Sequence, residues 1–342
     1  MDTSTLPRNM PHLRRFLAWI LVPLVLLVPV AVRAGDNAPP LTIGLIVAGN
    51  VEKVTEDWKP FTDALAKELQ VPVKVLASKN YADISGALMD GRVQVAWINN
   101  KLAIELVEND QAAVFAQMVR LDGSRGYKSL LFARKDGPIQ SVADVISRPG
   151  VYSLGSGDKK STSGYLVPNY YVFAKNKIVP EKHFKQVSNA NHLDNFLAVA
   201  DGKVDIATNN TEELPRYQAE FAEKFARVRV IWESPLIPND PILYRKDLPA
   251  PTQQRIKKFF TTYGRTEAEK TTLKNINGLS GFRASSSYQL RPIVDLELFQ
   301  TLTSAMAENA NSPEKLQTVM GTLTKRAARL DTALNATRLD SP

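Results

Sequence analysis

The sequence predicts an α/β protein built as two lobes, each with a mostly parallel sheet flanked by helices, and a cleft between them. Short β-rich runs alternate with amphipathic helical segments from Pro39 onward, which is the pattern of repeated β-α-β units. Glycine- or proline-rich crossings interrupt this pattern near 122–127 and near 238–246. The chain has 342 residues and no cysteine, and this length is enough to bury one large core or two smaller ones.

Residues 1–34 have the pattern of a secretory signal peptide that is cleaved after Ala34. Basic residues precede an apolar run from 16 to 32, and small residues follow it. Pro23 and Pro29 interrupt the run, so an uncleaved membrane anchor is the less favoured alternative. Cleavage near this position predicts a secreted protein of the periplasm.

The rest of the chain is mildly basic. Residues 1–34 contain four Arg and one Asp, so without them the net charge falls from +8 to +5. Basic residues are interspersed with acidic ones, without a basic stripe or a basic-aromatic pattern. This distribution argues against nucleic acid as a partner.

The first series of elements alternates strands with helices over residues 35–122. We expect strands at 41–47, 71–75 and 93–97, where β-branched and apolar residues gather. Apolar residues at helical spacing mark the helices between them. These residues are Trp58, Phe61, Leu65 and Leu69 in the first helix, and Ile84 and Leu88 in the second.

The second series covers residues 123–245, with strands expected at 129–133, 151–154 and 204–208 and helices between them. A long helical segment begins at Thr252, so we assign residues 246–292 to the first lobe together with 35–122. Residues 293–342 are rich in Leu, Ala and polar residues and predict a C-terminal helical extension. This extension would serve as a packing element or as the contact of a homodimer.

Three consecutive hydroxyl residues, Ser161, Thr162 and Ser163, stand where a helix is expected to begin. The helical face that follows consists of Val167, Tyr170, Tyr171 and Ala174. Free amides and the helix dipole attract anions to a helix start, and hydroxyls add further donors. The stretch is therefore a candidate site for a phosphate-like oxyanion, and the alternative is that Ser161 or Ser163 only caps a helix in water.

Further candidates follow the other expected strands, because ligands of open α/β sheets bind beyond the carboxyl ends of the strands. This criterion selects Tyr81, Asn99, Asn100, Tyr127, Asn191, His192, Glu212 and Asp240. Hydroxyls, one histidine and two carboxylates would then converge on one cleft. Each residue also has an ordinary explanation: the tyrosines can pack a ring at a loop, and His192 and Glu212 can lie at helix starts.

Catalysis and metal binding have weak support in the sequence. Only His183 and His192 remain after residue 34, and neither a His-x-x-x-His motif nor a cluster of aspartates is present. A Ser161-His192-Asp triad would lack the Gly-x-Ser-x-Gly turn that presents a nucleophile. A periplasmic hydrolase is therefore a remote alternative to a binding protein.

Several long segments of the chain resemble the periplasmic phosphonate-binding proteins of bacterial ABC transporters. They are 122–127, 161–175, 204–212, 234–241 and 282–286. The resemblance covers nearly all of the chain after residue 34. It implies a two-lobed type II periplasmic-binding-protein fold that closes on its ligand, needs no cofactor, and delivers the ligand to a membrane permease.

The resemblance also implies roles for the candidate residues. Those expected to hold the phosphonate are Tyr127, Ser161, Thr162, Ser163 and His192. Those expected to hold a ligand ammonium, as in 2-aminoethylphosphonate, are Tyr81, Glu212 and Asp240. A receptor for phosphate, phosphite or a phosphate ester is the alternative. The segment 97–100, Trp-Ile-Asn-Asn, departs from the family's Trp-Tyr-Gly-Asn, so the resemblance does not fix the substituent on phosphorus.

Overall fold

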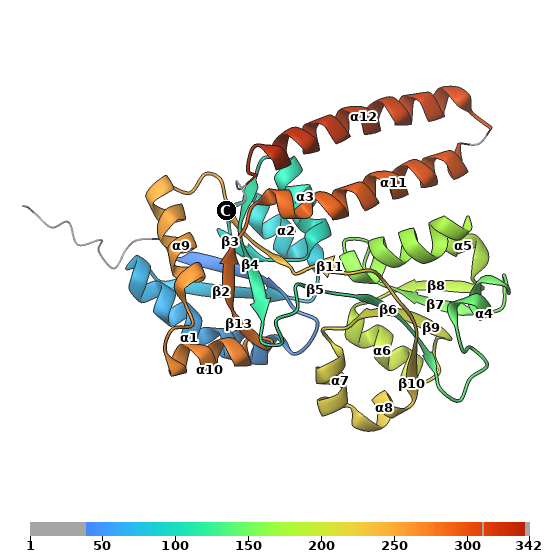
Figure 1. Ribbon diagram of the computed structural model, residues 1–342, viewed down its shortest axis with the longest axis horizontal. Helices are drawn as coiled ribbons and strands as arrows, with labels where there is room; N and C mark the ends of the chain where they lie inside the picture. The colour runs from blue at the N-terminus through green and yellow to red at the C-terminus, as the bar shows by residue number, and fades with distance from the viewer. Residues whose placement is uncertain (1–38, 310, 339–342) are drawn as a thin grey trace, which may run out of the picture. The chain divides into compact units, whose positions relative to one another are not determined.

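Two mixed β-sheets organise the chain (Figure 1). The computed structural model describes residues 39–309 and 311–338. The expected signal peptide, residues 1–34, lies outside the described residues. Within them, no helix combines the length and the apolar character that a membrane-spanning segment needs.

The first sheet has the strand order β13-β4-β12-β3-β1-β2. Its strands are β1 (Leu41–Ile46), β2 (Val73–Ser78), β3 (Val95–Trp97), β4 (Ala112–Arg120), β12 (Pro241–Arg245) and β13 (Leu279–Ala284). Strands β1 to β4 share one direction, and β12 and β13 run against them. The prediction of a mostly parallel sheet is therefore correct in that most strands run in one direction. Neighbouring strands, however, form antiparallel as well as parallel pairs.

Helices cover both faces of this sheet. They are α1 (Val51–Leu69), α2 (Tyr81–Met89), α3 (Asn100–Glu108), α9 (Ala250–Thr262) and α10 (Glu267–Asn275). Val95 of β3 packs in one core cluster with Trp58 of α1, while its neighbour Ala96 packs in another with Leu102 of α3. Because successive side chains of a strand point to opposite faces, α1 and α9 cover one face and α2 and α3 the other.

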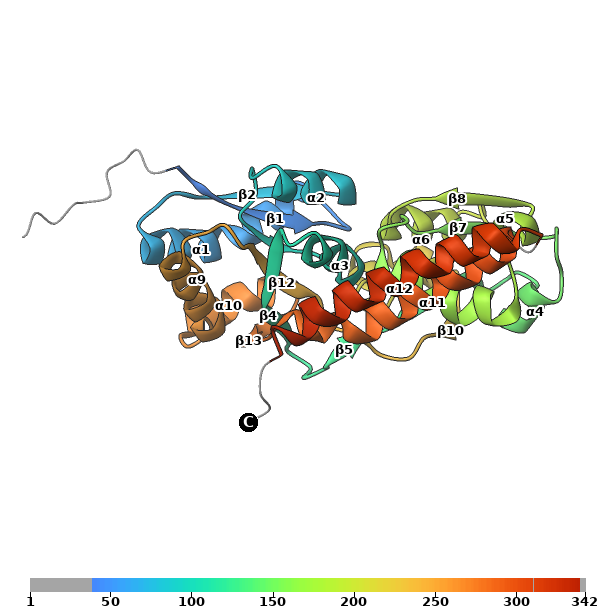
Figure 2. The ribbon, with the colours of Figure 1, turned by 90° about the horizontal axis from the view of Figure 1, so that it is seen from above.

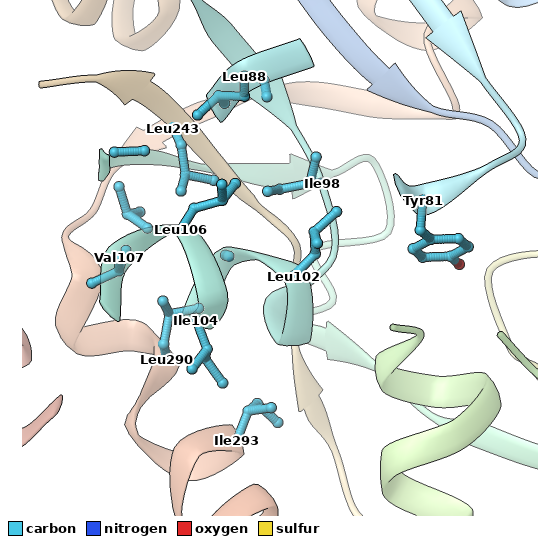
Figure 3. Packing of buried hydrophobic residues seen from close by; sticks show 14 of the residues in the cluster. Tyr81, Leu88, Ile98, Leu102, Ile104, Leu106, Val107, Leu243, Leu290 and Ile293 are labelled. Atoms are coloured by element: carbon cyan, nitrogen blue, oxygen red, sulfur yellow. The ribbon is translucent and has the colours of Figure 1, made fainter. Parts of the chain in front are cut away.

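The core beside α2 and α3 holds Tyr81 in place. Figure 3 shows Leu102, Leu106 and Leu243 in the aliphatic cluster, with the Tyr81 ring beside them and its hydroxyl pointing away. Tyr81 begins α2 and is 8% exposed. The packed ring therefore fixes the direction of a polar group that leaves the core.

The second sheet has the strand order β10-β6-β9-β7-β8. Its strands are β6 (Ser129–Arg134), β7 (Ser153–Ser156), β8 (Gln186–Asn189), β9 (Ile206–Asn210) and β10 (Val228–Glu233). Strands β7, β8 and β9 are parallel, and β6 runs against both β9 and β10. The α-helices of this half are α4 (Val142–Ile146), α5 (Pro180–His183), α6 (His192–Ala200), α7 (Leu214–Glu220) and α8 (Ala222–Ala226).

Two short strands carry the chain between the halves. β5 (Gly126–Tyr127) and β11 (Ile237–Pro238) form an antiparallel pair. The assignment of residues up to 245 to the second lobe is wrong for 241–245, because β12 pairs with β3 and β4 in the first sheet. Pro241 suggested a loop, but a proline is tolerated as the first residue of a strand.

The helix that follows Ser161 is wider than an α-helix. Its π-type turns are η1 (Thr162–Leu166) and η2 (Asn169–Phe173), and a 3-10 turn, η3 (Ala174–Asn176), ends it. The predicted helix start is confirmed: the Ser161 hydroxyl accepts a hydrogen bond from Gly164 N at 3.0 Å. The predicted buried face is only partly right, because Val172 and Phe173 are buried while Tyr170 and Tyr171 are half-buried. A wider turn shifts the spacing of side chains away from the α-helical period.

Helices α11 (Arg291–Glu308) and α12 (Pro313–Asn335) form the C-terminal extension and lie side by side (Figures 1 and 2). α11 contacts α3 of the first half and the irregular helix of the second. Its Phe299 ring meets the Tyr170 ring at a centroid distance of 5.1 Å. Arg326 of α12 donates at 2.8 Å to Glu108 of α3 and to Glu297 of α11. The extension therefore packs on both halves.

Candidate functional site

A cavity of about 350 Å³ lies between the two halves. In the first half its walls include the end of β1, the loop after it and the start of α1. In the second half they include the start of the irregular helix, the start of α6 and part of α7. The cavity brings together most of the sequence-predicted residues: Tyr81, Tyr127, Ser161, Ser163, His192, Glu212 and Asp240.

Part of the cavity wall consists of neutral hydrogen-bonding groups. His192 Nε2 lies 3.4 Å from Ser163 Oγ, and Asn210 Nδ2 lies 3.4 Å from the same oxygen. Ser161, Ser163 and His192 are all at least 90% buried. Hydroxyl, amide and imidazole groups can donate to the oxygens of a tetrahedral anion. Asn210 joins this group although the sequence analysis did not select it.

His192 is neutral in this setting, because burial lowers its pKa. Its Nδ1 has no hydrogen-bond partner among the described residues. A catalytic triad needs an acid that orients the far ring nitrogen, and the hydroxyl beside the imidazole belongs to Ser163 rather than Ser161. The geometry therefore does not support the Ser161-His192-Asp triad of the hydrolase alternative.

Two half-buried acids, Glu212 and Asp240, line the same cavity. Asp240 Oδ1 accepts hydrogen bonds from the Tyr127 hydroxyl at 3.1 Å and from Asn100 Nδ2 at 3.3 Å. Glu212 Oε1 accepts from Arg120 Nη1 at 2.6 Å. The described residues contain no cluster of three or more His, Asp or Glu side chains that would hold a metal ion.

Burial makes both acids costly to ionise. It raises the pKa of Glu212 to about 7, against the lowering effect of Arg120, and Glu213 adds a smaller upward shift. Burial also raises the pKa of Asp240 well above its ordinary value, and repulsion from Glu212 adds to the shift. Burial raises the pKa of Tyr81 and Tyr127, so both hydroxyls keep their protons. A cation beside the carboxylates would offset the cost of their charge.

The Asp240→Asn variant is expected to gain stability relative to the parent as the pH of the ligand-free protein rises from 5 to 8. A raised native pKa means that the native state binds more protons than the unfolded state, so the acid destabilises the fold increasingly above its unfolded pKa of about 4. His192 acts in the opposite direction below about pH 6.5. It is present in both proteins, so it cancels in the difference. Urea unfolding at each pH measures that difference, and a pH-independent value would contradict the prediction.

Thr162 is expected to hold the phosphonate but does not line the cavity, and the candidates Asn100 and Asn191 do not line it either. Its buried hydroxyl donates to Asn99 Oδ1 at 2.9 Å and accepts from Lys101 N at 2.9 Å. Asn99 Oδ1 also caps α3 by accepting from Leu102 N at 3.0 Å. The hydroxyl of Thr162 therefore joins the second half of the protein to the start of α3 in the first half. From the sequence, this hydroxyl was expected to hold the phosphonate instead.

Several charged residues in or beside the cavity wall were not predicted from the sequence, among them Arg120 and Arg216. Arg120 ends β4, a strand that was not proposed, although the apolar run 112–119 signals it. Arg216 of α7 donates to Glu213 at 2.9 Å and reaches the Ala48 carbonyl of the other half at 3.4 Å. The contact of Arg216 with Ala48 depends on how the two halves meet, and no local sequence pattern predicts that.

Comparison with known proteins adds an independent line of observation. A family model described as the periplasmic substrate-binding protein of phosphonate ABC transporters matches residues 43–290. The chain is 41% identical over 284 residues to the phosphonates-binding periplasmic protein of Escherichia coli strain K12, and the alignment covers 83% of each protein.

Solved structures show the same similarity. A binding protein component of a phosphonate ABC transporter from Pseudomonas aeruginosa matches with a TM-score of 0.80 and 38% identity, covering 87% of this chain and 98% of that one. A Prochlorococcus marinus protein in complex with methylphosphonate matches with a TM-score of 0.68 and 19% identity, covering 76% of this chain and 98% of that one. The second match concerns the fold alone. Together they confirm the predicted two-lobed α/β fold.

Proposed function

Because the chain belongs to the family of periplasmic substrate-binding proteins of phosphonate ABC transporters, we propose that its ligand is a small organophosphonate with an ammonium group. The leading candidate is 2-aminoethylphosphonate. The relatives are substrate-binding proteins rather than enzymes, so the protein delivers its ligand to a permease unchanged. The observation that carries the ligand proposal is the presence of Glu212 and Asp240 in the same cavity as Ser161, Ser163 and His192, whose side chains suit an oxyanion.

In this proposal Ser161, Ser163 and His192 hold the phosphonate. Their hydroxyl and imidazole groups are buried together, and hydrogen bonds to a charged group are stronger than those between neutral groups. Tyr127 also lines the cavity, and its hydroxyl donates to Asp240. Thr162 contributes through its contact with α3 rather than through its hydroxyl on the ligand.

In this proposal the ammonium lies among Asp240, Glu212 and Tyr81, which also line the cavity. A carboxylate near a bare oxyanion repels it, so phosphate or phosphite would bind poorly beside these acids. An ammonium between the phosphonate and the acids replaces that repulsion with attraction. The acids therefore favour an aminophosphonate over the inorganic oxyanions.

Calorimetry with four ligands tests the proposal. We expect 2-aminoethylphosphonate to bind most tightly and ethylphosphonate to bind at least about tenfold more weakly, which corresponds to about 1.4 kcal/mol for the lost ammonium contacts. Phosphate and phosphite should bind more weakly still. Tighter binding of either inorganic anion than of the aminophosphonate would contradict the proposal. Phosphorus NMR of the incubated ligand should show it unchanged, whereas a hydrolase would release phosphate.

We also propose that the protein reaches the periplasm by cleavage of residues 1–34. The sequence pattern before Ala34 and the periplasmic family support this. Sequencing the N-terminus of the exported protein should find Gly35 first. Retention of residues 1–34 on membrane-bound protein would contradict it.

The C-terminal extension is proposed to join two copies of the chain. Phe299 and Met306 of α11 and Met320 of α12 are 46%, 52% and 49% exposed, which is high for large apolar side chains. A second copy would cover them. Light scattering should give a dimer mass for the parent and a monomer mass for Met306→Glu/Met320→Glu, and a monomeric parent would contradict the proposal.

A further inference from the structure

We propose that Arg120 is a specificity-determining residue: it engages Glu212 in an ion pair between the two halves and leaves Asp240 as the acid that holds the ligand ammonium. The inference rests on the proposed function, because it assigns parts within the same cavity. In this inference Glu212 does not contact the ligand; instead, its ion pair with Arg120 holds the two halves together. Arg120 then decides how much negative charge the ligand meets.

The Arg120–Glu212 pair is short and well shielded from solvent. Arg120 Nη1 lies 2.6 Å from Glu212 Oε1, and the two side chains are 13% and 11% exposed. Arg120 ends β4 of the first sheet, and Glu212 follows β9 of the second. Shielding from water strengthens a charged hydrogen bond. The pair can form only while the two halves lie together, so it belongs to the closed arrangement of the cavity.

Of the acids that line the cavity, Asp240 is the one that is shielded from solvent and has no cation beside it; Glu220 also has no ion pair but is exposed to solvent. Glu212 pairs with Arg120, and Glu213 pairs with Arg216. Asp240 receives hydrogen bonds from the neutral Tyr127 hydroxyl and Asn100 amide, and no ion pair joins it to a Lys, Arg or His among the described residues. A buried carboxylate without a cation is unfavourable. The ammonium of the ligand would give Asp240 the cation that it lacks.

This arrangement distinguishes a paired acid from an unpaired one. If Glu212 and Arg120 act as a unit, replacing both with neutral amides removes no net charge from the cavity. The ammonium would then still meet Asp240, and the preference for an amine-bearing ligand would remain. If Glu212 instead contacts the ammonium directly, the same double replacement would remove half of the ammonium site.

Calorimetry on four proteins tests the proposal, with 2-aminoethylphosphonate and ethylphosphonate as the two ligands. The proteins are the parent, Asp240→Asn, Arg120→Gln, and the double variant Arg120→Gln/Glu212→Gln. The measured quantity is the selectivity, defined as the Kd of ethylphosphonate divided by the Kd of 2-aminoethylphosphonate. We expect Asp240→Asn to lower the selectivity by more than about tenfold. The double variant should keep it within about threefold of the parent.

Arg120→Gln alone gives a second prediction of opposite sign. It removes the cation that lowers the pKa of Glu212 and that repels the ligand ammonium, so at a pH where Glu212 is ionised the selectivity for the ammonium should rise above that of the parent. A double variant that loses selectivity as Asp240→Asn does would overturn the proposal, and so would an unchanged or lowered selectivity in Arg120→Gln. A parent that binds both ligands equally would contradict the aminophosphonate function itself. The two failures are therefore distinguishable.

Discussion

Replacing both Ser161 and Ser163 with Ala is expected to weaken phosphonate binding by at least about a hundredfold. Each hydroxyl that donates to a charged oxygen contributes about 1.5 to 3 kcal/mol, and tenfold in affinity corresponds to about 1.4 kcal/mol. Both residues are buried and line the cavity, so water replaces their hydroxyls poorly. Calorimetry with 2-aminoethylphosphonate and with ethylphosphonate measures the loss. Both ligands should lose affinity, since both carry the phosphonate.

The loss of a helix cap is the effect that this experiment must separate. Ser161 caps η1, so its removal also costs about 1 kcal/mol of stability. Thr266→Ala is the matched control, because Thr266 caps α10 by accepting from Glu269 N at 3.2 Å and does not line the cavity. It should lower the unfolding temperature similarly without changing ligand affinity. Unchanged binding by the double serine variant would leave the serines as caps only.

Gly126→Ala is expected to destabilise the fold by about 3 kcal/mol, at the upper end of the range for overpacking. A Cβ at this position would lie 2.0 Å from the Ile237 carbonyl oxygen, and backbone cannot move aside as a flexible side chain can. Gly126 pairs with Pro238 where both connections between the halves run side by side. The next residue is Tyr127, so phosphonate affinity should fall as well.

Gly86→Ala provides the opposite result with the same change of one methyl group. Gly86 lies inside α2, and a Cβ there would meet nothing within 4 Å. Alanine is favoured over glycine in a helix, so this variant should gain about 0.5 to 1 kcal/mol. Thermal and urea unfolding measure both variants. Equal stability of Gly126→Ala and Gly86→Ala would show that the crossing tolerates the side chain.

The parallel core of each half could be predicted from the sequence because its signals are local. Apolar spacing located α1 and β1, and the hydroxyl cluster located the start of the irregular helix. The strands β12 and β13 were missed because Pro241 and Gly281 are typical of loops. Their place in the sheet depends on pairing with distant β4, which no local pattern encodes.

In the candidate site, too, locally encoded features could be predicted and features that depend on distant parts of the chain could not. Ser161 and Ser163 were selected by residue type and position, and the cavity contains both. Thr162 satisfied the same criteria, yet its hydroxyl faces α3 instead. Neighbouring residues of a helix point in different directions, so three consecutive hydroxyls cannot all serve one small ligand in the same way. Arg120 required knowledge of which half would meet Glu212.

The contact of Thr162 with α3 bears on how long a ligand stays bound. Thr162 lies between Ser161 and Ser163 in the chain. The halves therefore cannot separate around a ligand without breaking the hydrogen bonds of Thr162 to Asn99 and Lys101. Escape of the ligand then includes a step whose barrier is set by groups that touch no ligand atom. Changes at Thr162 would shorten residence time more than they slow capture, since most affinity changes fall on the dissociation rate.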